Sequence, residues 1–107
     1  MSADLIARLR AQLGGPRDGA LLRFSLGTAL LQNGDAAGAA SAFREAVGFD
    51  AKYSAAWKML GKSLAESGEE TAAIEAYERG LEVARSRGDK QVEREIGVFL
   101  RRMEKSR

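Results

Sequence analysis

The amino-acid sequence predicts an all-α protein in which about six helices pack as a stack of antiparallel hairpins. Three features of the 107-residue chain lead to this fold class. Apolar residues recur at spacings of three and four, which is the period of one helix face. Glycines beside polar residues separate these stretches, as expected for short turns. Several residue types also recur 34 positions apart, so one hairpin is repeated along the chain.

The composition is that of a globular protein with a single domain. Of the residues, 45% are hydrophobic and 30% are charged, and this length suffices for one modest core. The chain contains no histidine and no cysteine, so it lacks the commonest general base, the thiolate nucleophile and the usual transition-metal ligands. We therefore expect a protein that is not an enzyme and that holds no cofactor and no metal.

The distribution of charge bears on location. Asp4, Arg8 and Arg10 interrupt the N-terminal apolar residues, and no run approaches the ~20 apolar residues of a membrane span. Without cysteine there is no disulfide framework. We expect a cytoplasmic protein with no membrane association. The net charge of +2 conceals a basic end, because residues 85–107 carry eight basic and four acidic side chains.

The N-terminal segment, residues 1–15, is predicted to form one helix that ends at Gly14-Gly15-Pro16. Its apolar stripe includes Leu5 and Leu9. Leu5 lies 34 positions before Ala39, which places this helix in phase with the second helix of a hairpin. We expect both leucines to pack inward.

The next segment, residues 20–53, is predicted to be the first complete hairpin. Its two helices are expected at residues 19–33 and 36–47. Asp18 and Asp35 precede them, at positions where a carboxylate can accept hydrogen bonds from the free amides of a first helical turn. Gly34 provides the turn between the helices.

A second hairpin is predicted for residues 54–87, with its turn at Gly68. Bulky and small residues alternate along the facing sides of its helices, so that large side chains fill the gaps beside glycine and alanine. These residues are Trp57, Leu60, Gly61 and Leu64 on the first helix, and Ala73, Tyr77 and Gly80 on the second.

The last segment, residues 88–107, is predicted to contain one helix at 90–104, which starts after Gly88-Asp89. Gly97 lies 36 positions after Gly61 in the same local pattern. This helix therefore matches the first half of a further hairpin, and its many charges suit a terminal helix with one side in water.

The spacing of Trp57, Leu60, Gly61, Leu64, Gly68, Ala73 and Tyr77 resembles the signature of the tetratricopeptide repeat family. The residue pairs that keep the 34-residue period are Gly27 and Gly61, Gly34 and Gly68, Ala39 and Ala73, and Phe43 and Tyr77. The resemblance implies a right-handed stack with half a repeat at 1–15, full repeats at 20–53 and 54–87, and half a repeat at 88–107. It also implies a non-enzymatic scaffold that binds a peptide or protein segment in a concave groove.

In this family the groove is lined by the first helix of each repeat. The groove residues that the resemblance implies are Leu21, Phe24, Thr28, Leu31, Lys58, Met59, Lys62, Arg94 and Arg101. Such a groove is apolar at one end and basic at the other, which favours an acidic or a mixed apolar-acidic partner. Phe24 and Thr28 stand where relatives that clamp chaperone peptides have Lys and Asn, so that particular ligand is disfavoured.

Lys58 and Lys62 lie one helical turn apart, where like charges repel by a few tenths of a kcal/mol. The pair is explained either by a solvated helix face or by a ligand anion that offsets it.

Two other functions are compatible with the sequence. The chain could self-associate through its N-terminal or its last helix, and we expect a monomer or a weak homodimer. Nucleic-acid binding through residues 85–107 is disfavoured, because that segment has a single aromatic residue, Phe99, which is expected to be in the core.

Overall fold

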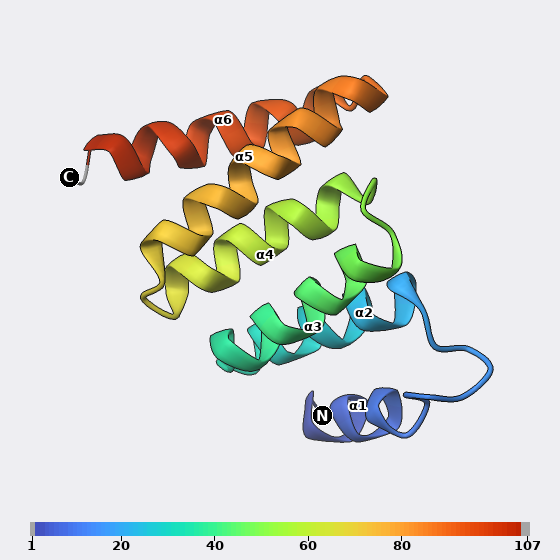
Figure 1. Cartoon of the computed structure of the whole chain (residues 1–107). Coiled ribbons are helices and arrows are strands. Elements are labelled where there is room, and N and C mark those ends of the chain that lie inside the picture. The colour runs from blue at the N-terminus through green and yellow to red at the C-terminus, as the bar shows by residue number, and fades with distance from the viewer. Residues whose placement is uncertain (1, 106–107) are drawn as a thin grey trace.

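The computed structural model describes residues 2–105, and within that range the chain forms helices and no strand (Figure 1). The six helices are α1 (Ser2–Arg10), α2 (Ala20–Gln32), α3 (Ala36–Phe49), α4 (Ser54–Glu66), α5 (Glu70–Arg87) and α6 (Lys90–Lys105). The predicted all-α class and the number of helices are confirmed. The ends of the predicted segments at residues 1, 106 and 107 lie outside the described range. The division into two full and two half repeats stays a prediction.

The helices form two layers. Each helix packs against the next one along the chain, and in addition α2 contacts α4 and α4 contacts α6. Over residues 2–105, α1, α3 and α5 make no comparable contacts with one another. We call α2, α4 and α6 the inner layer, and α1, α3 and α5 the outer layer (Figure 1). Within residues 2–105, contacts between non-consecutive helices occur only in the inner layer, an arrangement that favours a stack curved toward that layer.

The helix boundaries follow from a few local signals. Gly34 and Gly68 have φ of 85° and 87°, a conformation that favours glycine, and they end α2 and α4 at equivalent places. The Asp35 carboxylate accepts a hydrogen bond of 2.8 Å from the amide of Gly38, which confirms its predicted role as the cap of α3.

The prediction that Asp18 caps α2 is wrong. The residue at the cap position is Gly19, which makes no side-chain hydrogen bond. The Asp18 carboxylate instead accepts two hydrogen bonds from the Arg23 guanidinium, at 2.9 and 2.8 Å, and one from the Gly14 amide at 2.8 Å. A bidentate pair with a charged donor is stronger than a bond to a neutral amide, so Asp18 ties the α1–α2 connection to the side of α2.

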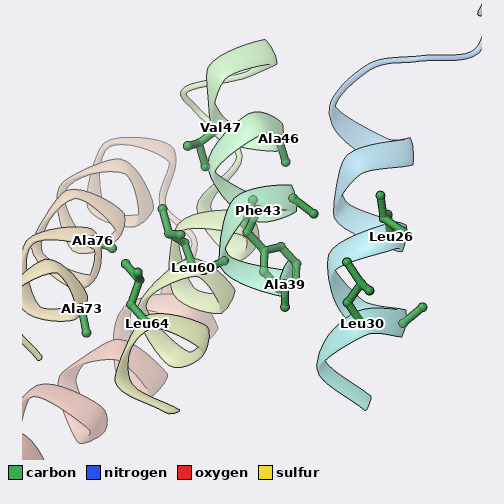
Figure 2. Packing of buried hydrophobic residues seen from close by; sticks show 14 of the residues in the cluster. Leu26, Leu30, Ala39, Phe43, Ala46, Val47, Leu60, Leu64, Ala73 and Ala76 are labelled. Carbon is green, nitrogen blue, oxygen red and sulfur yellow. The ribbon is translucent and has the colours of Figure 1, made fainter. Parts of the chain in front are cut away.

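The main core lies between the inner and outer layers (Figure 2). Its buried side chains include Leu26, Leu30, Ala39, Phe43, Leu60, Leu64 and Ala73. A second cluster joins α5 to α6, where the Tyr77 and Phe99 rings stack with their centroids 5.4 Å apart. Burial raises the pKa of the Tyr77 hydroxyl to about 12.

Two inner-layer glycines allow the hairpins to close. A Cβ atom at Gly27 would lie 2.8 Å from the Phe43 ring, and one at Gly61 would lie 2.5 Å from the Tyr77 ring. Both distances are too short for real atoms, so only glycine lets each ring pack on the backbone of the partner helix. The 34-residue period therefore records a repeated contact between a glycine and an aromatic ring.

The packing of α1 confirms half of what the sequence predicts. Ile6 is buried and Leu9 packs against the core, but Leu5 is 40% exposed. The reason is that α1 has a single neighbour, α2, within the described range. Ile6 lies 34 positions before the buried Ala40 and faces that neighbour, whereas the side of α1 that carries Leu5 faces no other helix.

Candidate interaction surface

All nine groove residues implied by the sequence lie on inner-layer helices. Leu21, Phe24, Thr28 and Leu31 are on α2, Lys58, Met59 and Lys62 are on α4, and Arg94 and Arg101 are on α6. Since the stack curves toward this layer, a ligand on its face could touch several helices at once. The structure nevertheless gives these side chains different surroundings.

On α2, Leu21 is the apolar side chain that is open to solvent, with 71% of its surface exposed. Phe24 is half-buried: its ring stacks on Tyr53 at 4.9 Å between centroids and meets Phe43 edge-on at 5.5 Å. The Phe24 ring is therefore only partly accessible to a ligand. Because helix residues three apart are neighbours, Leu21 and Phe24 lie on the same side of α2.

The other two α2 positions are occupied with the protein's own contacts. The Thr28 hydroxyl donates a hydrogen bond of 3.0 Å to the carbonyl oxygen of Phe24, one turn earlier in the helix. Leu31 is half-buried and packs against the core. Both side chains are therefore less accessible to a ligand than Leu21.

On α4, the two lysines differ in their partners. Lys58 forms an ion pair with Glu95 of α6, with 3.0 Å between Nζ and Oε1, and the lysine side chain is only 19% exposed. Lys62 is exposed and has no hydrogen-bond or ion-pair partner within residues 2–105. Met59 lies half-buried between them. The free positive charge of α4 is thus at Lys62, while Lys58 joins two inner helices.

Arg94 and Arg101 border a hollow between α5 and α6 of about 370 Å³, which we call the terminal hollow. Its lining residues are Leu81, Arg85, Glu93, Arg94, Gly97, Val98 and Arg101. The guanidinium of Arg85 forms an ion pair with Glu93 at 3.2 Å. The basic residues predicted for one end of a single groove are therefore divided between the α4 face and this hollow.

Three residues organise these surfaces through contacts that were not predicted from the sequence. Tyr53 lies in the α3–α4 connection and stacks on Phe24, and Glu95 neutralises Lys58 from another helix. Arg23 occupies the position of the family's usual tryptophan, and it binds Asp18 at 2.8 Å and Glu45 at 2.9 Å. Of these contacts, only the Asp18–Arg23 pair could be suggested by the sequence, because the two oppositely charged residues are close along the chain.

The electrostatic consequence is local. The Arg23 guanidinium beside Asp18 holds the pKa of that carboxyl well below its usual range. The hydroxyl of Ser54 donates a 2.7 Å hydrogen bond to Asp89 and likewise lowers the pKa of that carboxyl. Both carboxylates hold helix ends together, so their shifted pKa values are explained by structure and do not indicate acid–base chemistry.

None of the helices in residues 2–105 combines the length and the apolar character that crossing a membrane requires. Nor does any group of three carboxylates in that range lie close enough together to hold a metal ion.

Comparison with known proteins identifies the repeat. A family profile described as "Tetratricopeptide repeat" matches residues 3–54 and 24–90. A TPR repeat-containing protein of Pseudomonas aeruginosa is 45% identical over 103 residues, which cover 96% of this chain and 98% of the relative.

Solved structures show the same arrangement of helices. One is the solution structure of a Bordetella parapertussis protein whose sequence is 43% identical. The match covers 95% of this chain and 89% of that protein, with a TM-score of 0.82. Another is the crystal structure of a tetratricopeptide repeat domain protein from Salinibacter ruber, whose sequence is 28% identical. That match covers 81% of this chain and 97% of the other, with a TM-score of 0.75.

Proposed function

The chain belongs to the tetratricopeptide repeat family, and on this premise we propose that it is a non-enzymatic module that binds a peptide or protein segment along its inner layer. Domains of this fold generally mediate protein–protein interaction. Because α2 contacts α4 and α4 contacts α6, an extended segment laid along the inner layer would contact all three helices together.

The observation that carries the proposal is the exposure of Leu21. A leucine with 71% of its surface in water contributes little to folding, and it is three residues before Phe24, whose half-buried ring stacks on Tyr53. A partner's apolar side chain packed on Leu21 and the edge of this stack would remove apolar area from water at about 25 cal/mol per Å². Such an apolar anchor commonly dominates the binding energy of a peptide.

The charges on α4 favour an acidic or a mixed apolar-acidic partner. Lys62 is free to pair with a carboxylate, and Lys58 is one turn away with its charge engaged by Glu95. A partner carboxylate would pair with Lys62 as Glu95 pairs with Lys58. The spacing from Leu21 on α2 to Lys62 on α4 then sets the order of apolar and acidic residues in the bound segment.

Fluorescence anisotropy tests this proposal with a short labelled peptide that carries leucines at one end and glutamates at the other. We expect Leu21→Ser and Lys62→Glu each to weaken binding about tenfold or more, which corresponds to ~1.4 kcal/mol. The matched control is Lys52→Glu, an exposed lysine in the α3–α4 connection, which should bind as tightly as the unaltered protein. Equal binding by all three variants would refute the inner layer as the site.

Self-association is a second candidate function, favoured by the 40% exposure of Leu5 on α1. Sedimentation of the purified protein at ~100 µM separates the two functions, because binding through α1 would increase the mass with concentration. A monomer over that range would leave the inner-layer module as the better account.

A further inference from the structure

The third glycine of the inner-layer series lacks the contact that the first two make. Gly27 is covered by the Phe43 ring and Gly61 by the Tyr77 ring, each from the outer-layer helix that follows. Gly97 holds the equivalent place on α6, and a Cβ added there would meet only Nη1 of Arg101, at 3.6 Å. Within residues 2–105 no helix follows α6, so the backbone beside Gly97 remains open.

The terminal hollow lies beside this open glycine. Its floor is apolar, with Leu81 from α5 and Val98 from α6, and 36% of the Val98 side chain is exposed. Arg94 and Arg101 border it without an ion-pair partner in the described range.

The other two charged residues that line the hollow, Arg85 and Glu93, neutralise each other. Arg85 is paired with Glu93, which Lys90 also approaches at 4.0 Å, so the lining itself carries a net positive charge.

We propose that the terminal hollow docks an amphipathic helix of a partner protein, with an aromatic side chain on Gly97 and carboxylates directed at Arg94 and Arg101. The aromatic residue follows from the molecule itself, since both other inner-layer glycines of the series are covered by one. The carboxylates follow from the two unpaired guanidinium groups, which bind carboxylates in a bidentate manner. This site is separate from the inner-layer face on which Leu21 and Lys62 lie, and it does not depend on that face binding a ligand.

A second copy of the chain fits this hollow less well. Its α1 also has an uncovered face, and Leu9 on that helix is 34 positions before Phe43, but Leu9 already packs against the core of its own molecule. Arg8 and Arg10 also flank that leucine, so the docked helix would bring further positive charge to a basic hollow. Charge complementarity therefore favours an acidic helix of another protein.

The experiment uses three acetylated and amidated peptides copied from the chain's own outer-layer helices, each titrated into the full-length protein and observed by amide chemical shifts. Residues 70–83 contain Tyr77 and carry four glutamates and one arginine. Residues 36–49 contain Phe43 and carry no net charge, and residues 2–13 contain Leu9 and carry a net charge of +1.

We expect the 70–83 peptide to bind about tenfold or more tightly than the other two, with shifts concentrated on Gly97, Val98 and Arg101. Tightest binding by the 2–13 peptide would overturn the proposal in favour of a second copy. Shifts centred on Gly61, with loss of the native α5 signals, would mean that the peptide replaces α5, and would also overturn it.

Two variants separate this site from the inner layer. Gly97→Leu should fold normally, because its side chain enters open space, and should weaken binding of the 70–83 peptide about tenfold by occupying the place of the aromatic ring. Lys52→Glu, an exposed position on neither surface, is the control and should leave this affinity unchanged. If Lys62→Glu weakened binding and Gly97→Leu did not, the peptide would be on the inner layer and the proposal would be wrong.

Discussion

Gly61 and Gly97 occupy the same place in successive units, and their surroundings are opposite. A methyl group at Gly61 would collide with the Tyr77 ring, whereas at Gly97 it would meet only the end of a flexible arginine. Glycine lowers helix stability in both places, because it leaves the unfolded backbone more freedom. At Gly61 the packing of the repeat requires glycine, whereas at Gly97 only the lower helix propensity of glycine matters.

Alanine at these two glycines should change stability in opposite directions. We expect Gly61→Ala to lower the free energy of unfolding by about 1–3 kcal/mol through overpacking. We expect Gly97→Ala to raise it by about 0.5–1 kcal/mol through helix propensity. Urea denaturation followed by circular dichroism measures both. A stabilised Gly61→Ala protein would contradict the contact between Gly61 and the Tyr77 ring.

Ser63 is a polar residue in an apolar environment. Its side chain is fully buried in α4, and its hydroxyl has no hydrogen-bond partner among the described residues. Replacing it with alanine removes an unsatisfied polar atom, so Ser63→Ala should raise the free energy of unfolding by about 1 kcal/mol. Ser67→Ala is the control, because that hydroxyl donates to the Leu64 carbonyl oxygen at 3.0 Å and its loss should bring no gain. A destabilised Ser63→Ala protein would show that the hydroxyl has a partner in solution.

At the scale of the elements, two aspartates hold helix ends together. Asp89 accepts a hydrogen bond from the amide of Val92 at the start of α6 and another from the hydroxyl of Ser54 at the start of α4. Asp18 likewise joins the α1–α2 connection to Arg23. The pKa of each carboxyl is lower in the folded protein than its ordinary value.

Stability should therefore fall in acid. Because the folded-state pKa values are depressed, the unfolded chain takes up protons first, and the contribution is complete above the ordinary aspartate pKa of about 3.9. It is lost as the pH falls below that value toward the folded pKa. Asp89→Ala should cost about 1 kcal/mol at neutral pH and flatten this decline. Thermal unfolding between pH 7 and pH 2 measures the effect, and identical pH profiles for both proteins would contradict it.

The sequence predicts the elements better than the contacts between them. Gly34, Gly68 and Asp35 act locally, so the helix ends they determine could be read directly. Asp18 could not, because its choice between capping α2 and binding Arg23 depends on how the connection folds.

The same limit applies to the candidate surface. The family resemblance placed the nine residues on the first helix of each repeat, but the stacking of Phe24 on Tyr53 and the pairing of Lys58 with Glu95 depend on how helices pack. The exposure of Leu5 reflects the absence of a second neighbour for α1 in the described range, which no local pattern reveals.

For the whole molecule, the curvature toward the inner layer determines what a ligand could reach. The Lys58–Glu95 ion pair joins α4 to α6 across that face and holds one of its positive charges. An acidic segment bound on the inner layer would compete with Glu95 for this lysine.

Removing the competitor should strengthen binding of acidic peptides. We expect Glu95→Gln to raise the affinity for the leucine- and glutamate-containing peptide a few-fold, because Lys58 becomes free to pair with it. The change should cost less than about 1 kcal/mol of stability, since the pair is only partly buried. Anisotropy titration gives the affinity, and Glu104→Gln, an exposed glutamate near the end of α6, is the matched control. Weaker binding by Glu95→Gln alone would contradict the competition.

An amide chemical-shift titration of the full chain with the leucine- and glutamate-containing peptide shows whether the inner layer binds a partner segment. We expect shifts on Leu21, Phe24 and Lys62 that saturate together, with little change on the outer layer. Shifts confined to α1 that depend on protein concentration would instead indicate self-association. That result would contradict binding of a partner segment by the inner layer.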